Sequence, residues 1–191
     1  MTTQFAIHDE TTAPEKARPV LEQARKSLGA IPSLYGVLAE NPAALNAYQT
    51  LSRIFGEAGL SPLEQQIVTI ATSVENECHF CVAAHSAIAA GQNLDQDVIN
   101  ALRDNRPIND AKLEALRAFT RKVVIQRGFV SDADVEAFLA SGYDQAAVLA
   151  VIVGVSLKVI SNYTNHVAET PVNDIFQPFT WTPPGRVVAA E

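Results

Sequence analysis

The sequence predicts an all-α protein, a bundle of eight or nine helices. Residues that start and stop helices recur at short intervals, whereas the alternating pattern of a strand is almost absent. The 191 residues suit one domain better than two, and 48% of them are hydrophobic, which is enough to bury a core. We expect one helical domain over residues 1–191, with an N-terminal arm at 1–13 and an irregular aromatic tail at 171–191.

Proline and capping residues place the helices expected in the first part of the chain. Asn41 and Ser61 stand as N-cap residues directly before prolines, which suit the first turn of a helix. Ser61 and Glu64 together form a capping box. The expected helices run from Pro14 to about Ser27, from Pro32, from Pro42 to Ala58, from Pro62, and from Cys78 to Ala90.

The second part of the chain repeats these signals. Ser131 begins a capping-box-like start with Asp134, and glycines follow the expected helix ends, where a left-handed residue closes a helix. Asp144 precedes the longest and most apolar segment. The expected helices run from after Asn93 to about Arg103, from Asn109 or Asp110 to Gly128, from Ser131 to near Gly142, and from Asp144 to about Val167.

Charge and hydropathy exclude several classes of function. The net charge is −7, with no long run of either sign, so the chain offers no basic surface for a nucleic acid. The first ten residues lack the basic and apolar regions of a secretory signal. The most apolar stretch, Ala146–Leu157, is 12 residues long, short of the ~20 that a membrane span needs. We expect a cytoplasmic protein.

The chemistry is concentrated in the two cysteines, Cys78 and Cys81, and in the nearby His85. On a helix that turns about 100° per residue, these three side chains share one face, and His85 lies one turn beyond Cys81. Backbone N–H groups and the positive end of the helix dipole favour a thiolate at a helix start. The spacing also lets the second sulfur reach an oxidised first one and close a disulfide. We therefore interpret the pair as a redox-active dithiol.

Other interpretations of the pair remain open. The cysteines could be buried small hydrophobic residues, which is their ordinary role. They could bind zinc together with His85, although a structural zinc site needs a fourth ligand that the sequence does not identify. Haem attachment is excluded, because Val82 stands where that motif requires a histidine.

Two stretches of sequence carry a resemblance to a known family. The run Leu60-Ser61-Pro62-Leu63-Glu64-Gln65-Gln66 is followed by Cys78-x-x-Cys81-x-x-x-His85, and the ending Asn162-Tyr163-Thr164-Asn165-His166 precedes Thr170-Pro171. These motifs resemble the AhpD-like alkylhydroperoxidase / carboxymuconolactone decarboxylase family, in its peroxidase-related branch.

This resemblance implies an all-α fold, assembly as a dimer, trimer or hexamer, and thiol-dependent reduction of hydroperoxides. It makes Cys81 the peroxidatic cysteine and Cys78 the resolving one, with His85 in the proton relay. No metal or organic cofactor is required. An external dithiol of unidentified nature would reopen the disulfide, and Cys78, near the helix start, is the sulfur that we expect to be more accessible.

One position departs from the family pattern. The family places a glutamate twelve residues before the first cysteine, and this chain has Gln66 there. A glutamine can orient a partner but cannot carry a proton away. Glu75, one turn before Cys78, could substitute, whereas Glu64 suits the capping box. Two alternatives to a peroxidase therefore stay open, namely a non-redox lyase of the decarboxylase branch and a binding or scaffold protein that has lost catalysis.

The final part of the chain predicts that the protein is not a monomer. The expected helix from Asp144 to Val167 is apolar nearly all round, which implies burial in the bundle or between subunits. The tail carries Phe176, Phe179 and Trp181 among prolines, so it cannot be helical and is too aromatic to lie in solvent. We expect it to pack on its own domain or on a neighbouring subunit.

Overall fold

A computed structural model describes residues 4–184 and shows an all-α fold, as predicted. Within these residues there are nine α-helices and two short 3₁₀ helices, and no strand. The elements are η1 (Glu15–Ala17), α1 (Arg18–Leu28), α2 (Ser33–Leu38), α3 (Pro42–Gly56), α4 (Pro62–Glu75), α5 (His79–Gly91), α6 (Gln96–Arg103), α7 (Ala111–Ile125), α8 (Asp132–Ala140), α9 (Gln145–Ala168) and η2 (Asp174–Phe179).

The helix starts follow from capping residues that the sequence displays. Both capping boxes form, because the Ser61 and Ser131 hydroxyls accept backbone N–H groups of the first turns and the carboxylates of Glu64 and Asp134 bond back. Asn41, Asp110 and Asp144 are N-caps as predicted, which settles the choice between Asn109 and Asp110.

Two predicted starts were wrong by a few residues. The segment after Pro14 forms the single 3₁₀ turn η1 before α1 begins at Arg18, with a proline in the first turn of α1. Helix α6 begins at Gln96 because the Asp95 carboxylate caps it by accepting from two backbone N–H groups.

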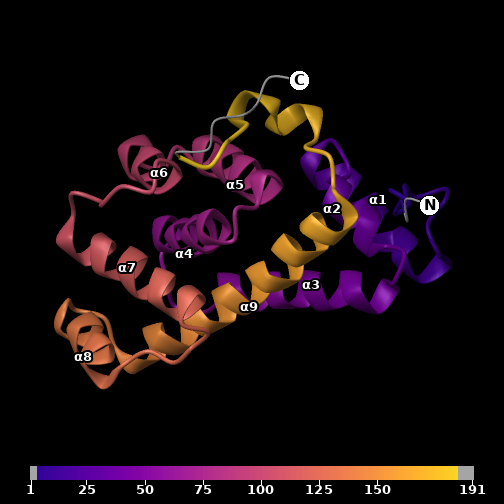
Figure 1. Ribbon diagram of the computed structural model, residues 1–191. Helices are drawn as coiled ribbons and strands as arrows, with labels where there is room; N and C mark the ends of the chain where they lie inside the picture. The colour runs from indigo at the N-terminus through magenta and orange to yellow at the C-terminus, as the bar shows by residue number, and fades with distance from the viewer. Residues whose placement is uncertain (1–3, 185–191) are drawn as a thin grey trace.

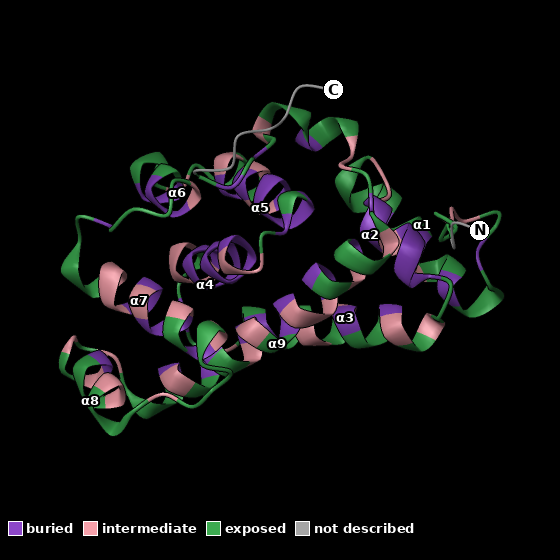
Figure 2. Ribbon diagram, viewed as in Figure 1, coloured by how far each residue is buried: buried purple, intermediate pink, exposed green. Residues whose placement is uncertain are grey.

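Helix α4 lies at the centre of the bundle, with α5, α6, α7 and α9 packed against it (Figure 1). Nine of its fourteen residues are buried, and Figure 2 shows it as mostly buried within a shell of half-exposed helices. Helix α9 crosses both α3 and α4. Gly154 allows this close crossing, because a Cβ atom there would lie 2.6 Å from a methyl carbon of Val68 and 2.7 Å from the ring of Phe55.

The tail after α9 folds back over α5. Phe176 packs edge-to-face on Phe80 of α5, and the indole of Trp181 donates a hydrogen bond to the Arg103 carbonyl at 2.7 Å. Both aromatic side chains are buried, so of the two expected positions, on its own domain or on a neighbouring subunit, the described part of the tail takes the first. The prediction of a tail without any helix was wrong, because Asp174–Phe179 forms the 3₁₀ turn η2.

Helix α9 has the length and mean hydropathy (1.8) of a membrane span, and it is the only such helix in the described chain. The apolar stretch Ala146–Leu157 lies within this helix, and the criterion is met over a longer window of 18 residues. Length and composition are weak grounds for a span, since the core helix of a soluble protein meets the same criterion. One face of α9 is buried against α3 and α4, while Leu149 (63% exposed) and Val167 (71% exposed) point outward.

Candidate active site

The two cysteines lie at the start of α5, in the middle of the fold. Cys78 is the N-cap residue of α5, and Cys81 occupies its first turn, as the sequence predicts. The two residues come within 3.5 Å of each other and are not joined by a disulfide. Cys78 is 1% exposed and Cys81 is 2% exposed. The expectation that Cys78 is the more accessible sulfur was therefore wrong, because the tail packs over the first turn of α5.

The two sulfurs have opposite tendencies to ionise. Burial opposes a charge on Cys81, but a hydrogen bond from Cys78, the positive charge of Lys158 and the polar groups of Ser161 and Asn162 outweigh it. The pKa of Cys81 is held well below that of a free thiol. The hydrogen bond that Cys78 gives to Cys81, together with burial and the charge on Cys81, raises the pKa of Cys78. Cys81 is thus the sulfur of the pair that ionises more readily.

His85 lies between a glutamine and a lysine. Its Nδ1 atom is 2.9 Å from Oε1 of Gln66, and its Nε2 atom is 2.9 Å from Nζ of Lys158. Burial and the charge of Lys158 lower the pKa of His85 well below 6.5, so the ring is neutral. The network assigns the tautomer, because an ammonium only donates and an amide oxygen only accepts. Nε2 accepts from Lys158, and Nδ1–H donates to Gln66.

The structure does not bring all five predicted site residues together. Gln66 is hydrogen-bonded to the half-buried His85, Cys78 lies against Cys81, and Cys81 and His85 line one cavity, so these four residues form one cluster. The carboxylate of Glu75 is instead hydrogen-bonded to the guanidinium of Arg121 on α7. Glu75 is therefore engaged in an ion pair between α4 and α7, and no described contact joins it to the sulfurs or to His85.

Sequence reasoning missed one face of α9 that borders the cluster. Lys158, Ser161, Asn162 and Asn165 stand at positions i, i+3, i+4 and i+7 and are all buried. The side-chain amide of Asn165 donates to the Cys81 sulfur at 3.3 Å and to the Cys78 sulfur at 3.6 Å. One feature of the sequence could have indicated this face: Lys158 is the only Asp, Glu, Lys or Arg in the 24 residues of α9.

A cavity of about 210 Å³ opens beside Cys81. Cys81, His85 and Lys158 line it together, so a bound molecule would meet all three side chains. The rest of the wall is mostly apolar and aromatic, with Leu34, Tyr35, Tyr48, Phe80, Ile88 and Phe176. The arrangement can present a thiolate and a cation to a small apolar molecule that carries one reactive polar group.

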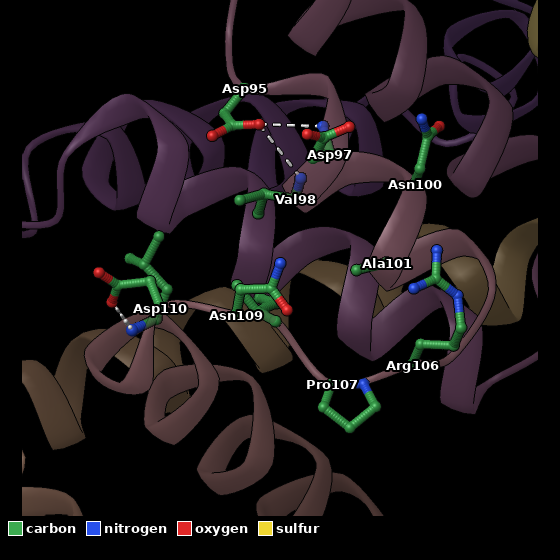
Figure 3. Close-up of a pocket in the computed structure, with 11 residues that line it drawn as sticks. Asp95, Asp97, Val98, Asn100, Ala101, Arg106, Pro107, Asn109 and Asp110 are labelled. Carbon is green, nitrogen blue, oxygen red and sulfur yellow. Dashed lines mark hydrogen bonds between the residues drawn. The ribbon is translucent and has the colours of Figure 1, made fainter.

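A larger hollow of about 510 Å³ lies between α6 and the start of α7, away from the cysteines (Figure 3). Its polar lining has structural roles. The Asp95 carboxylate caps α6, the Asp110 carboxylate caps α7, and Arg106 pairs with Asp104. Because these groups bind neighbouring backbone or each other, we place the candidate active site at the smaller cavity, where the reactive groups converge.

In the part of the chain that the structure describes, no group of three or more His, Cys, Asp and Glu side chains is placed to hold a metal ion. His85 shares a face with the cysteines, but its two ring nitrogens are bonded to Gln66 and Lys158. Its nitrogens are thus already engaged in the buried network.

Comparisons with known proteins agree with this architecture. Residues 39–121, which include α3 to α7 apart from the last turn of α7, match the carboxymuconolactone decarboxylase family. No protein with a curated description matches the chain.

Several solved structures share the fold. A peroxidase-related protein from Ralstonia eutropha JMP134, described as an alkylhydroperoxidase AhpD core, has a TM-score of 0.82 at 22% identity, over 91% of this chain and 93% of its own. A peroxidase-related protein from Silicibacter sp. TM1040 has a TM-score of 0.77 at 21% identity, over 92% and 97%. The debrominase Bmp8 has a TM-score of 0.77 at 14% identity, over 94% and 96%. At these identities the likeness establishes the AhpD-like fold.

Proposed function

Because residues 39–121 match the carboxymuconolactone decarboxylase family and the chain has an AhpD-like fold, we propose that it is a thiol-dependent peroxidase that reduces hydroperoxides through Cys81 and Cys78. The observation that carries the proposal is the 3.5 Å approach of Cys78 to Cys81, with Cys81 in the wall of a cavity that His85 and Lys158 also line. A thiolate is the nucleophile that peroxide reduction needs, and a neighbouring thiol is the group that resolves its product.

The first step of the proposed cycle takes place at Cys81. The thiolate attacks one oxygen of the hydroperoxide, an S–O bond forms and the O–O bond breaks. The sulfur is oxidised to a sulfenic acid, and the peroxide is reduced to an alkoxide that takes up one proton and leaves as the alcohol. Nε2 of His85 accepts from the Lys158 ammonium, and both residues line the cavity, so the ring can pass the Lys158 proton to the alkoxide and leave the amine neutral.

The second step closes the disulfide. The two cysteines come within 3.5 Å of each other before the reaction. The sulfur of Cys78 attacks the sulfenic sulfur, and the hydroxyl group leaves as water with the proton from Cys78. An external dithiol then reduces the disulfide by exchange and is itself oxidised. The donor has to reach a buried bond, so the tail over α5 must give way during this step.

The lining of the cavity favours organic hydroperoxides over hydrogen peroxide. Aromatic and aliphatic side chains form most of the wall, and an apolar substituent gains binding free energy by leaving water for such a surface. Gln66 holds the Nδ1 side of His85 by accepting its hydrogen bond. In this proposal Gln66 orients the ring, and the proton moves through the Nε2 side.

Consumption of cumene hydroperoxide with dithiothreitol as the external dithiol tests the proposal. We expect turnover by the wild type and loss of turnover in Cys81→Ser. Phe129→Ala, at an exposed aromatic residue outside the cluster, is the matched control and should retain turnover. A wild type that consumes no hydroperoxide above the dithiothreitol background would favour the lyase or scaffold alternative.

A further inference from the structure

Lys158 is a buried cation without a carboxylate partner. Its side chain lies in the middle of α9 and is 1% exposed. None of the ion pairs among the described residues involves it, and its Nζ atom donates to the neutral ring of His85. Burying an ammonium is costly unless an opposite charge lies close by. The structure must therefore supply that charge from a group other than Asp or Glu.

Most of the polar side chains around the cavity cannot supply a negative charge. Gln66 on α4 is neutral, and His85 on α5 can only be neutral or positive. Burial raises the pKa of Tyr35 on α2 and of Tyr48 on α3, so neither phenol ionises. Among the ionisable groups that face Lys158, only the two cysteines remain.

The contacts at the sulfurs decide between the two cysteines. Cys78 gives its hydrogen bond to Cys81, so Cys81 is the acceptor of the pair. The amide of Asn165 donates to both sulfurs and lies closer to Cys81, at 3.3 Å against 3.6 Å for Cys78. Cys81 lines the same cavity wall as Lys158, and the attraction between them is among the causes that favour its ionised form. A sulfur that accepts from these donors and lines a cavity with a cation is the one whose ionised form the site favours.

We propose that Lys158 is the positioning residue of the dithiol: its ammonium and the Cys81 thiolate form a buried charge pair, with His85 oriented between Gln66 and Lys158. The thiol proton of Cys81 goes to bulk water when the pair forms, so the cluster has no net charge. This inference rests on the proposed function only for its effect on turnover, because the charge pair exists before any peroxide binds.

The pair also accounts for a glutamine at position 66. A carboxylate there would lie against Nδ1 of His85, across the ring from Lys158, and would favour a protonated ring next to the ammonium. With the uncharged amide of Gln66, the ring stays neutral and accepts from Lys158. The charge that activates the nucleophile thus comes from α9 instead of α4.

The ultraviolet absorbance of the thiolate near 240 nm, followed against pH in the reduced protein, tests the inference without any peroxide. We expect one thiolate per chain at pH 7 in the wild type. Lys158→Met removes the charge and keeps the bulk of the side chain, and Lys158→Arg keeps the charge. Lys26→Met, at an exposed lysine on α1, is the matched control. Lys158→Arg and Lys26→Met should keep the thiolate at pH 7.

In Lys158→Met the pKa of Cys81 should rise, because the ammonium is lost while burial still opposes the charge, so the thiolate absorbance at pH 7 should fall below one thiolate per chain. Circular dichroism and the melting temperature show whether each variant folds, and Lys158→Gln is the second neutral variant if methionine is not accommodated. A wild type without a thiolate at pH 7, or a folded neutral variant that keeps it, would overturn the inference.

The activity assay separates this inference from the proposed function. If the charge pair titrates as expected but the wild type consumes no hydroperoxide, the inference stands and the proposed peroxidase is wrong. If the wild type consumes hydroperoxide while Lys158→Met keeps a full thiolate at pH 7, the peroxidase stands and the role of Lys158 is wrong.

Discussion

Lys158 of α9 donates a hydrogen bond to Nε2 of His85 on α5 at 2.9 Å, although the two residues are 73 positions apart in the sequence. This contact fixes the histidine as a neutral ring whose other nitrogen donates to Gln66. It also places a cation in the wall of the cavity that contains Cys81. The reactive cluster therefore depends on how α9 packs against α4 and α5.

The pKa of His85 makes the stability of the folded protein depend on pH. Burial and Lys158 hold this pKa well below 6.5 in the folded state. As the pH falls below about 6.5, the unfolded chain binds a proton at this histidine and the folded chain does not, so acid favours unfolding. Cys81 acts in the same direction, because its pKa is lower in the folded protein than in the unfolded chain. The stabilisation from its ionised form is complete above the ordinary thiol pKa and decreases as the pH falls toward the pKa of the folded state.

We therefore expect the melting temperature of the reduced protein to fall between pH 7 and pH 5, as followed by circular dichroism. The fall should be smaller in His85→Gln, which removes the histidine that the unfolded chain protonates. An equal fall in both proteins would show that His85 is not the group responsible.

Variants of Gln66 and Glu75 test which of the two residues acts on His85. Gln66 contacts the His85 ring, whereas Glu75 forms an ion pair between two helices. Gln66→Glu puts a carboxylate against Nδ1 of His85, so we expect the pKa of His85 to rise in an NMR titration. Turnover should rise with it, by at most ~10²-fold, because the ring can then carry a proton. Glu75→Gln breaks only the pair with Arg121 and should leave turnover unchanged. A large loss of turnover in Glu75→Gln would assign the relay to Glu75 instead.

The tail should control access to the cysteines. Trp181 packs beside His79, its carbonyl accepts from the His79 ring at 2.8 Å, and its indole is bonded to the Arg103 carbonyl. Trp181→Ala should loosen this cover and increase the rate at which iodoacetamide alkylates the reduced cysteines, measured by mass spectrometry. Phe129→Ala removes an aromatic side chain that is exposed and should not change the rate. Equal rates in all three proteins would show that the tail does not limit access.

We propose that the protein assembles into a closed oligomer through the outer face of α9. Leu149, Ile152, Tyr163 and Val167 are exposed along this helix, and such an apolar face is usually covered in symmetric assemblies. Light scattering at low micromolar concentration should give a mass of at least twice the 20.5 kDa of one chain. Leu149→Lys should lower that mass. A wild type at 20.5 kDa would contradict the proposal, and an unchanged oligomer in Leu149→Lys would move the interface elsewhere.

The sequence predicts the helical elements well because local chemistry sets them. Ser61, Ser131 and Asp144 cap their helices through hydrogen bonds within three residues, and such contacts can be recognised without tertiary structure. The Cys78 and Cys81 pair and its common face with His85 follow from helical spacing in the same way. These features needed no knowledge of how distant helices pack.

The remaining parts of the site could not be predicted because they depend on contacts between distant helices. A single lysine in an apolar helix gives no indication of which side chain it meets, and Lys158 reaches His85 only because α9 crosses α4. The pairing of Glu75 with Arg121 depends on the packing of α7 against α4. The burial of Cys78 likewise depends on the tail, which returns over α5 from about a hundred residues away.

The central claim is that Cys81 and Cys78 form one dithiol that peroxide converts to a disulfide, and intact-mass spectrometry tests it most directly. One equivalent of cumene hydroperoxide added to the reduced wild type should lower the mass by about 2 Da, the loss of two hydrogens, and dithiothreitol should restore it. Cys78→Ser should instead gain about 16 Da as a sulfenic acid, and Cys81→Ser should not react. An unchanged wild-type mass, or a stable gain of oxygen in the wild type without loss of both thiols, would contradict the account.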